Sequence, residues 1–162
     1  RYFNVFGRKQ DPNGAYAAVI PKFVMQLMDL ESPKINGDGN YSRDFTYIDD
    51  IVEGVVHCLD RVAQPNAEWS GLQPDPSSSK APWRVYNIGN SEPVELLRYI
   101  ELIEAALGKT TVKELLPLQP GDVEHTYADV ADLVRDTGYK PKVSVEEGIK
   151  RFVSWYCSFY KV

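Results

Sequence analysis

Short apolar runs alternate along this chain with longer segments in which apolar residues recur at helical spacing. The runs at 1–6, 34–36, 43–47, 83–89 and 111–115 predict strands, because β-branched and aromatic side chains suit a pleated sheet. The periodic segments at 17–30, 93–107, 128–137 and 145–160 predict amphipathic helices. This alternation favours a layered α/β or α+β domain over a β-sandwich or a helical bundle.

A further helix is expected after residue 49, where Asp49 or Thr46 could cap its first turn. Its predicted buried face consists of Ile51, Val52, Val55, Val56 and Leu59. The strands at 34–36 and 43–47 flank a Gly-Asp-Gly-Asn turn, and they form either a hairpin or two separate strands. Residues 63–82 predict a long surface loop, and the aromatic cluster at 155–160 predicts packing of the last helix.

Composition narrows the functional classes. With 162 residues, of which 43% are hydrophobic, the chain can bury the core of one globular domain. A net charge of -5 offers no basic footprint for nucleic acid or for an anionic membrane. Two distant cysteines and two isolated histidines do not have metal-ligand spacing. Without a long apolar run or a signal peptide pattern, the expected compartment is the cytoplasm.

Residues 42–50 (SRDFTYIDD) contain Arg43, the basic residue whose position points most clearly to a binding function. Arg43 lies between two short predicted strands, just before a helix. The planar fork of donors of an arginine there suits a phosphate or a diphosphate. From the residues alone, the alternative is a structural turn formed by Arg43 and Asp44.

Several strings resemble the extended short-chain dehydrogenase/reductase family, in particular its nucleotide-sugar 4-epimerases. Residues 42–50 resemble the RDF-T/V-YIDD segment of that family. Residues 1–22 resemble the region after the catalytic Tyr-x-x-x-Lys of bacterial UDP-N-acetylhexosamine 4-epimerases. The strings at 84–91, 93–96, 116–123 and 155–162 instead resemble UDP-glucuronate 4-epimerases. The resemblance therefore covers nearly the whole chain.

The resemblance implies an α/β fold that contains part of a Rossmann sheet. It also implies that residues 1–162 form a single C-terminal substrate-binding domain of a longer epimerase. Neither the Gly-rich dinucleotide motif nor Tyr-x-x-x-Lys occurs in the 162 residues, and the chain starts inside an apolar run without an initiating Met. We therefore expect no catalytic residue here, NAD held mainly by a missing N-terminal Rossmann half, and no activity of this chain alone.

The family's site residues can be carried over to matching positions. The resemblance implies that Tyr2 lies beside the nicotinamide of NAD and that Asn4 and Arg43 face the substrate diphosphate. It further implies substrate contacts at positions around the uridine and ribose, namely Ala18, Val19, Phe23, Ile35, Asn36 and Asp122. Two positions depart from the family. Gln119 is also expected to contact the substrate, but it stands where many members carry a second Arg. Lys34 occupies a position that is often Tyr.

The expected partner is thus a UDP-sugar, and UDP-glucuronate is preferred because the strings that resemble its epimerases span more residues. A UDP-N-acetylhexosamine 4-epimerase portion and a non-catalytic nucleotide-binding domain are the alternatives. The parent protein is expected to be a homodimer. The chain alone is expected to self-associate through the apolar strand at 1–6, whose partners would belong to the missing sheet.

Overall fold

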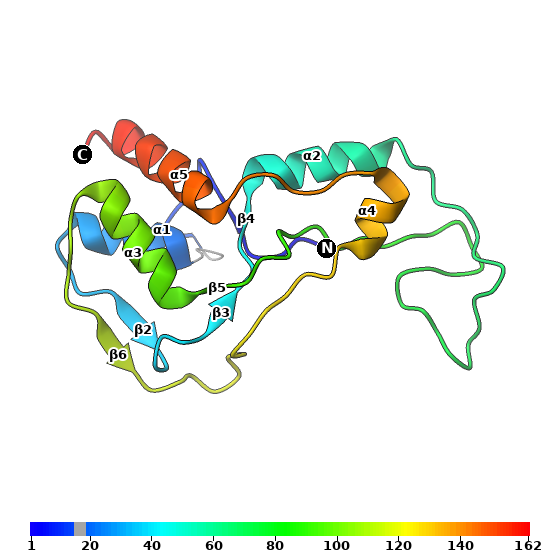
Figure 1. The fold of residues 1–162 in the computed structure, drawn as a ribbon, viewed down its shortest axis with the longest axis horizontal. Helices are drawn as coiled ribbons and strands as arrows, with labels where there is room; N and C mark the ends of the chain where they lie inside the picture. The colour runs from blue at the N-terminus through cyan, green and yellow to red at the C-terminus, as the bar shows by residue number, and fades with distance from the viewer. Residues whose placement is uncertain (15–18) are drawn as a thin grey trace.

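The computed structural model describes residues 1–14 and 19–162, and it has the alternating α/β order (Figure 1). The helices are α1 (Val19–Met28), α2 (Ile48–Leu59), α3 (Leu96–Leu107), α4 (Ala131–Thr137) and α5 (Val145–Tyr160). The strands are β1 (Val5–Phe6), β2 (Lys34–Asn36), β3 (Ser42–Arg43), β4 (Thr46–Tyr47), β5 (Val94–Glu95) and β6 (Glu114–Leu116).

The strands form pairs between segments that are distant in the sequence. β1 pairs with β4 and β2 with β6, both parallel, whereas β3 pairs with β5 antiparallel. The strands at 34–36 and 43–47 are therefore separate strands, and the second is divided into β3 and β4. The predicted strand at 83–89 is wrong, because that run forms only two isolated strand-type bridges, Arg84 with Ser78 and Ile88 with Tyr2.

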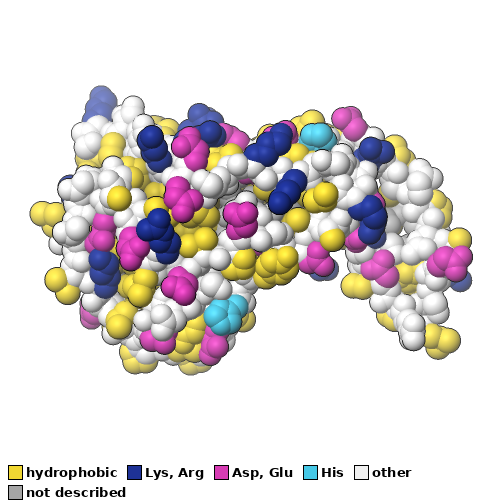
Figure 2. All heavy atoms as spheres, viewed as in Figure 1, with side chains coloured by type: hydrophobic (Ala, Val, Ile, Leu, Met, Phe, Trp, Pro, Cys, Tyr) yellow, Lys and Arg dark blue, Asp and Glu magenta, His cyan; other side chains and the backbone are white. Residues whose placement is uncertain are grey.

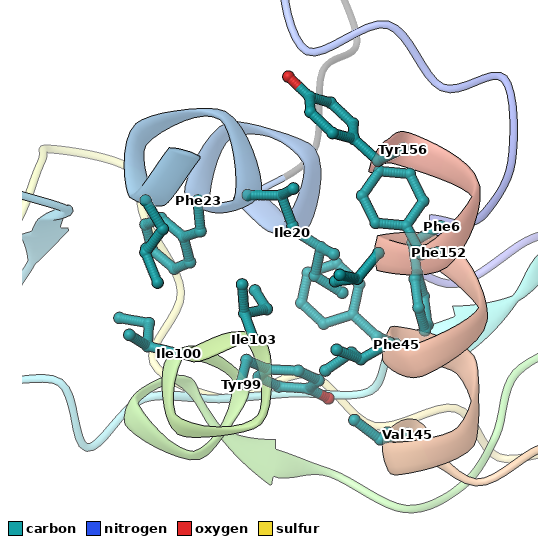
Figure 3. Packing of buried hydrophobic residues seen from close by; sticks show 14 of the residues in the cluster. Phe6, Ile20, Phe23, Phe45, Tyr99, Ile100, Ile103, Val145, Phe152 and Tyr156 are labelled. Atoms are coloured by element: carbon teal, nitrogen blue, oxygen red, sulfur yellow. The ribbon is translucent and has the colours of Figure 1, made fainter. Parts of the chain in front are cut away.

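The main core lies between α1, α3 and α5 (Figure 3). Phe45 packs edge-on against both Phe6 and Tyr99, which brings β1, α3 and the segment before β4 together. α5 approaches β1 closely at Gly148, where a Cβ atom would lie 2.7 Å from the ring of Phe6. Any larger residue at that position would separate the two elements.

α2 differs from its predicted packing. Ile51 is buried, but Val52, Val56 and Leu59 are 54%, 51% and 76% exposed. The helix rests on β1, β4 and a second, smaller cluster that includes Ile88, so only one narrow side of it is covered. Neither predicted cap forms, since the N-cap of α2 is Tyr47 and makes no side-chain hydrogen bond. The predicted buried face is therefore confirmed for Ile51, and Val55 packs against the second cluster, but it is wrong for Val52, Val56 and Leu59.

Residues 61–83 project from the body as an irregular segment (Figures 1 and 2). Arg84 ties the base of this segment to α4 through ion pairs of 2.6 Å with Asp132 and 3.3 Å with Asp136. Within the segment, the Asp75 carboxylate accepts hydrogen bonds from Ser77 and Ser78. The predicted loop is thus irregular but held by specific polar contacts.

Two further expectations need correction. At the end of α5, Tyr156 is buried in the core, but Phe159 and Tyr160 are 62% and 42% exposed. The strand at 1–6 finds partners within this chain, because β1 pairs with β4 and the amide of Phe3 donates to the carbonyl of Ile88 at 3.0 Å.

Among the described residues, no helix is both long and apolar enough to span a membrane.

Candidate functional site

A cavity of about 320 Å³ lies where β1, α1, β2 and β3 meet the segment that follows β6. Its lining combines apolar side chains, among them Val19 and Phe23 of α1, with polar and charged groups. The lining residues are Asn4, Val19, Phe23, Lys34, Asn36, Tyr41, Arg43, Phe45, Leu96, Leu118, Gln119 and Asp122. Residues that lie as far apart in the sequence as Asn4 and Asp122 thus share one concave site.

Asn4 is held in an unusual backbone conformation at the edge of this cavity. Its φ of 36° lies in the left-handed region, where a residue other than glycine costs about 1–3 kcal/mol. The side-chain amide donates to the carbonyl of Asp44 at 3.3 Å and to the hydroxyl of Thr126 at 3.0 Å. These bonds fix the direction of the side chain, and strained residues of this kind cluster at functional sites.

Arg43 is oriented by three contacts with the surrounding chain. Its Nη1 donates to the carbonyls of Ser42 at 3.0 Å and Glu124 at 2.9 Å. The hydroxyl of Tyr99, a residue buried in the main core, donates to the Arg43 carbonyl at 2.8 Å and so holds the backbone of Arg43 to α3. Within the described residues, the other guanidinium N–H groups make no hydrogen bond, so they remain available to an anionic ligand.

Tyr41 forms one wall of the cavity above the turn that follows β2. A Cβ atom on Gly37 would collide with the Tyr41 ring, and Gly37 has a φ of 82°, so glycine is needed there on both counts. Burial raises the pKa of Tyr41, and the nearby carboxylates of Asp38, Glu124 and Asp122 raise it further. The phenol is therefore neutral at physiological pH and offers a ring face and a hydroxyl.

The structure brings most of the predicted substrate positions together. Asn4, Val19, Phe23, Asn36, Arg43, Gln119 and Asp122 all line the cavity. Ile35 does not, because its side chain is fully buried in the core while its neighbours Lys34 and Asn36 line the cavity. Strand alternation explains this difference, since successive side chains point to opposite faces. Ala18 lies outside the described residues.

Tyr2, the predicted cofactor contact, lies outside the cavity. Its side chain is 61% exposed, and it borders two open hollows.

Sequence reasoning missed Tyr41, Phe45, Leu96 and Leu118 as lining residues. Tyr41 directly precedes β3 and could have been found as an aromatic residue beside Arg43. The others reach the cavity through long-range packing, for which no local sequence pattern exists.

A larger open hollow, of about 640 Å³, runs along α5 beside Arg8. Two of its cations are already paired, because Arg8 lies 3.4 Å from Asp49 and Arg151 lies 2.7 Å from Glu147. The carboxylates of Asp49 and Glu147 therefore compete with an anion for these two cations. No group of three or more potential metal ligands occurs among the residues that the structure describes.

Together, the fold and the cavity define an α/β protein with an oriented arginine at a concave, partly apolar site. Comparison of sequences extends this description. The model of the family described as "NAD dependent epimerase/dehydratase family" matches residues 1–89, more than half of the chain. This chain belongs to that family, which confirms the resemblance found in the sequence.

The curated relatives include "Protein CapI" of Staphylococcus aureus, 45% identical over 99% of this chain and 47% of its own length. A "Probable UDP-glucuronate 4-epimerase" of Rhizobium meliloti (strain 1021) is 42% identical over 99% of this chain and 46% of its own length. The chain thus spans about half the length of the curated relatives it matches.

Among solved structures, the chain resembles a UDP-N-acetylglucosamine 4-epimerase from Methanobrevibacter ruminantium M1 in complex with UDP-N-acetylmuramic acid. The TM-score is 0.78 and the identity 33%, over 98% of this chain and 45% of that chain. The α/β fold is therefore similar to part of such an epimerase.

Proposed function

We propose that this chain is the substrate-binding part of a longer NAD-dependent nucleotide-sugar 4-epimerase, and that its substrate is UDP-glucuronate. The observation that carries the proposal is the cavity itself. It gathers Asn4, Arg43 and Asp122, which come from three separate segments, around one concave site. These are positions at which the family resemblance implies contacts with a nucleoside diphosphate.

In this proposal, Arg43 binds the diphosphate through the N–H groups that its neighbours leave free, and Asn4 borders the same group. Val19 and Phe23 pack against the uridine, and Asn36 meets the edge of the base or ribose. The carboxylate of Asp122 accepts a hydrogen bond from a ribose hydroxyl. Gln119 adds a neutral polar contact in place of a second arginine, which makes Arg43 the principal cation for the diphosphate.

NAD would supply the hydride acceptor and donor of the epimerisation. The described residues do not build an NAD site, because they contain no Gly-rich turn at a helix N-terminus for the pyrophosphate. Tyr2, the single predicted cofactor contact, is 61% exposed. We therefore propose that NAD is held mainly by residues outside this sequence.

A UDP-N-acetylhexosamine is the second candidate substrate. The resemblance of residues 1–22 to epimerases of that group favours it, as does the 33% identity to the solved enzyme from Methanobrevibacter ruminantium M1. UDP-glucuronate is preferred because more strings of the sequence resemble UDP-glucuronate 4-epimerases, and because the relative named "Probable UDP-glucuronate 4-epimerase" is 42% identical. Turnover of both substrates by the protein encoded by the whole reading frame would decide between them.

Calorimetric titration of the 162-residue chain with UDP tests the binding role. We expect weak binding, reduced by about one to two decades in Arg43→Ala, because a charge-assisted hydrogen bond contributes about 1.5–3 kcal/mol. Arg98→Ala is the matched control, since Arg98 is half exposed on α3 and pairs with Glu101 at 3.1 Å. Equal UDP affinities of the Arg43 variant and the unchanged chain would mean that Arg43 is structural. A chain without UDP binding would overturn the proposed function.

A further inference from the structure

Thr126 joins three segments of the chain beside the cavity without lining it. Its hydroxyl oxygen accepts hydrogen bonds from the Asn4 side-chain amide at 3.0 Å and from the Asp44 backbone amide at 3.0 Å. Its own backbone amide donates to the carbonyl of Ser42 at 3.2 Å. One residue therefore contacts the segment before β1, β3 and the residue after β3.

The hydroxyl of Thr126 substitutes for a backbone acceptor in a short parallel ladder. The amide of Ser42 donates to the carbonyl of Glu124 at 3.1 Å, and Ser42 forms a parallel bridge with His125. In a regular parallel ladder, the next amide on that side, from Asp44, would donate to the carbonyl of Thr126. The hydroxyl oxygen of Thr126 accepts that hydrogen bond instead, which ends the ladder and lets the chain turn away.

The carboxylate of Asp44 holds the chain after this turn. Asp44 is fully buried, and its Oδ2 accepts hydrogen bonds from the amides of Ala128 at 2.8 Å and Ser91 at 3.0 Å. The turn is thus fastened on both sides of Thr126, by the ladder before it and by Asp44 after it.

The position of this ladder sets the direction of Arg43. The guanidinium Nη1 donates to the carbonyl of Glu124 at 2.9 Å, and Glu124 is the ladder residue two positions before Thr126. A shift of residues 124–126 along β3 would move that carbonyl and release the guanidinium. The same shift would remove one of the two acceptors of the Asn4 amide.

From this geometry we propose that Thr126 is a positioning residue for the diphosphate site. Its hydroxyl holds Arg43 and Asn4 in the one arrangement in which both face the cavity. The inference rests on the proposed function, because it assumes that the ligand carries a diphosphate at Arg43. It assigns no contact with the ligand to Thr126 itself.

Three chains test the proposal: the unchanged chain, Thr126→Val, which is isosteric but lacks the hydroxyl, and Thr126→Ser, which keeps it. NMR titrations with UDP and with uridine, which lacks both phosphates, separate the diphosphate site from the base site. We expect Thr126→Val to weaken UDP binding at least tenfold and uridine binding less than twofold. Thr126→Ser is expected to bind UDP within about threefold of the unchanged chain, since its hydroxyl can accept the same hydrogen bonds.

Unchanged UDP binding in Thr126→Val would overturn the positioning role. An equal loss of UDP and uridine binding would also overturn it, because that result indicates a general structural defect. Failure of the unchanged chain to bind UDP refutes the proposed function instead. In that case ¹⁵N relaxation of the Arg43 side chain without ligand still decides the positioning: greater mobility in Thr126→Val supports it, and equal mobility refutes it.

Discussion

Replacement of Asp50 by Ala should destabilise the protein far more than replacement of its neighbour Asp49. Both residues lie in the first turn of α2, so their interactions with the helix dipole are similar. Asp50 is 2% exposed, whereas the Asp49 side chain is 44% exposed. The comparison therefore isolates the effect of burial and of specific hydrogen bonds.

The magnitude follows from what each carboxylate contacts. Asp50 accepts hydrogen bonds from the amides of Lys142 at 3.1 Å and Val143 at 2.8 Å, and from the hydroxyl of Tyr139 at 3.0 Å. Loss of the carboxylate leaves two backbone amides without acceptors, at about 1–3 kcal/mol each. Because these amides are only partly buried, we expect a loss of about 3 kcal/mol in the free energy of unfolding for Asp50→Ala.

Asp49 makes only surface ion pairs, at 3.4 Å with Arg8 and 3.6 Å with Arg151. Exposed pairs contribute about 0–1 kcal/mol, so Asp49→Ala should cost less than about 1 kcal/mol. Urea unfolding followed by circular dichroism at neutral pH measures both values. If the two variants differ by less than about 1 kcal/mol at equal m-values, then Asp50 does not hold the segment before α5 to α2.

Three further outcomes are expected. The 162-residue chain should show no turnover of UDP-glucuronate or UDP-N-acetylglucosamine with added NAD, and any rate above a tag-only control would contradict this. Hydrogen bonds from Ser78 and Ser77 lower the pKa of Asp75 from 3.8 to about 2. The contacts of Asp75 in the projecting segment should therefore be fully present above pH 3.8, the pKa in the unfolded chain, and be lost as the pH falls through about 2. An Asp75 carboxylate that titrates near 3.8 by NMR would refute that assignment. Because the strand at 1–6 is paired within this chain, any self-association should instead depend on the exposed face of α2. The double variant Val52→Lys with Val56→Lys should therefore associate less in sedimentation velocity. Equal association of the variant and the unchanged chain would exclude that face.

The helices were predictable where a long periodic pattern coincided with clear boundary residues. The helix predicted over 145–160 matches α5, whose first turn is capped by the hydroxyl of Ser144. It ends at Tyr160, before Lys161, which has a left-handed φ of 58°. β2 also matches its prediction at 34–36. In each case neighbouring residues in the sequence carry the information.

The incorrect predictions share one physical cause, which is that the structure there depends on contacts between segments distant in the sequence. The apolar pattern of α2 indicates a helix, but it does not reveal that only a narrow side of that helix is covered in this chain. The run at 83–89 has strand-forming residues, yet its backbone hydrogen bonds depend on where Arg1, Phe3 and Ser77 lie. Asp50 serves as an acceptor for amides about ninety positions later, a role that no local pattern encodes.

In the candidate site too, some properties follow from the sequence and others only from the tertiary structure. The sequence by itself determined which residue types are present, including Arg43 with its neighbouring motif, and it determined the family through long matching strings. Only the tertiary structure decided that Asn4, Arg43 and Asp122 share a cavity, that Ile35 lies in the core, and that Thr126 connects the segments. Residue identity and periodicity are local properties of a chain, whereas the direction of a side chain depends on hydrogen bonds and packing between segments that meet only after folding.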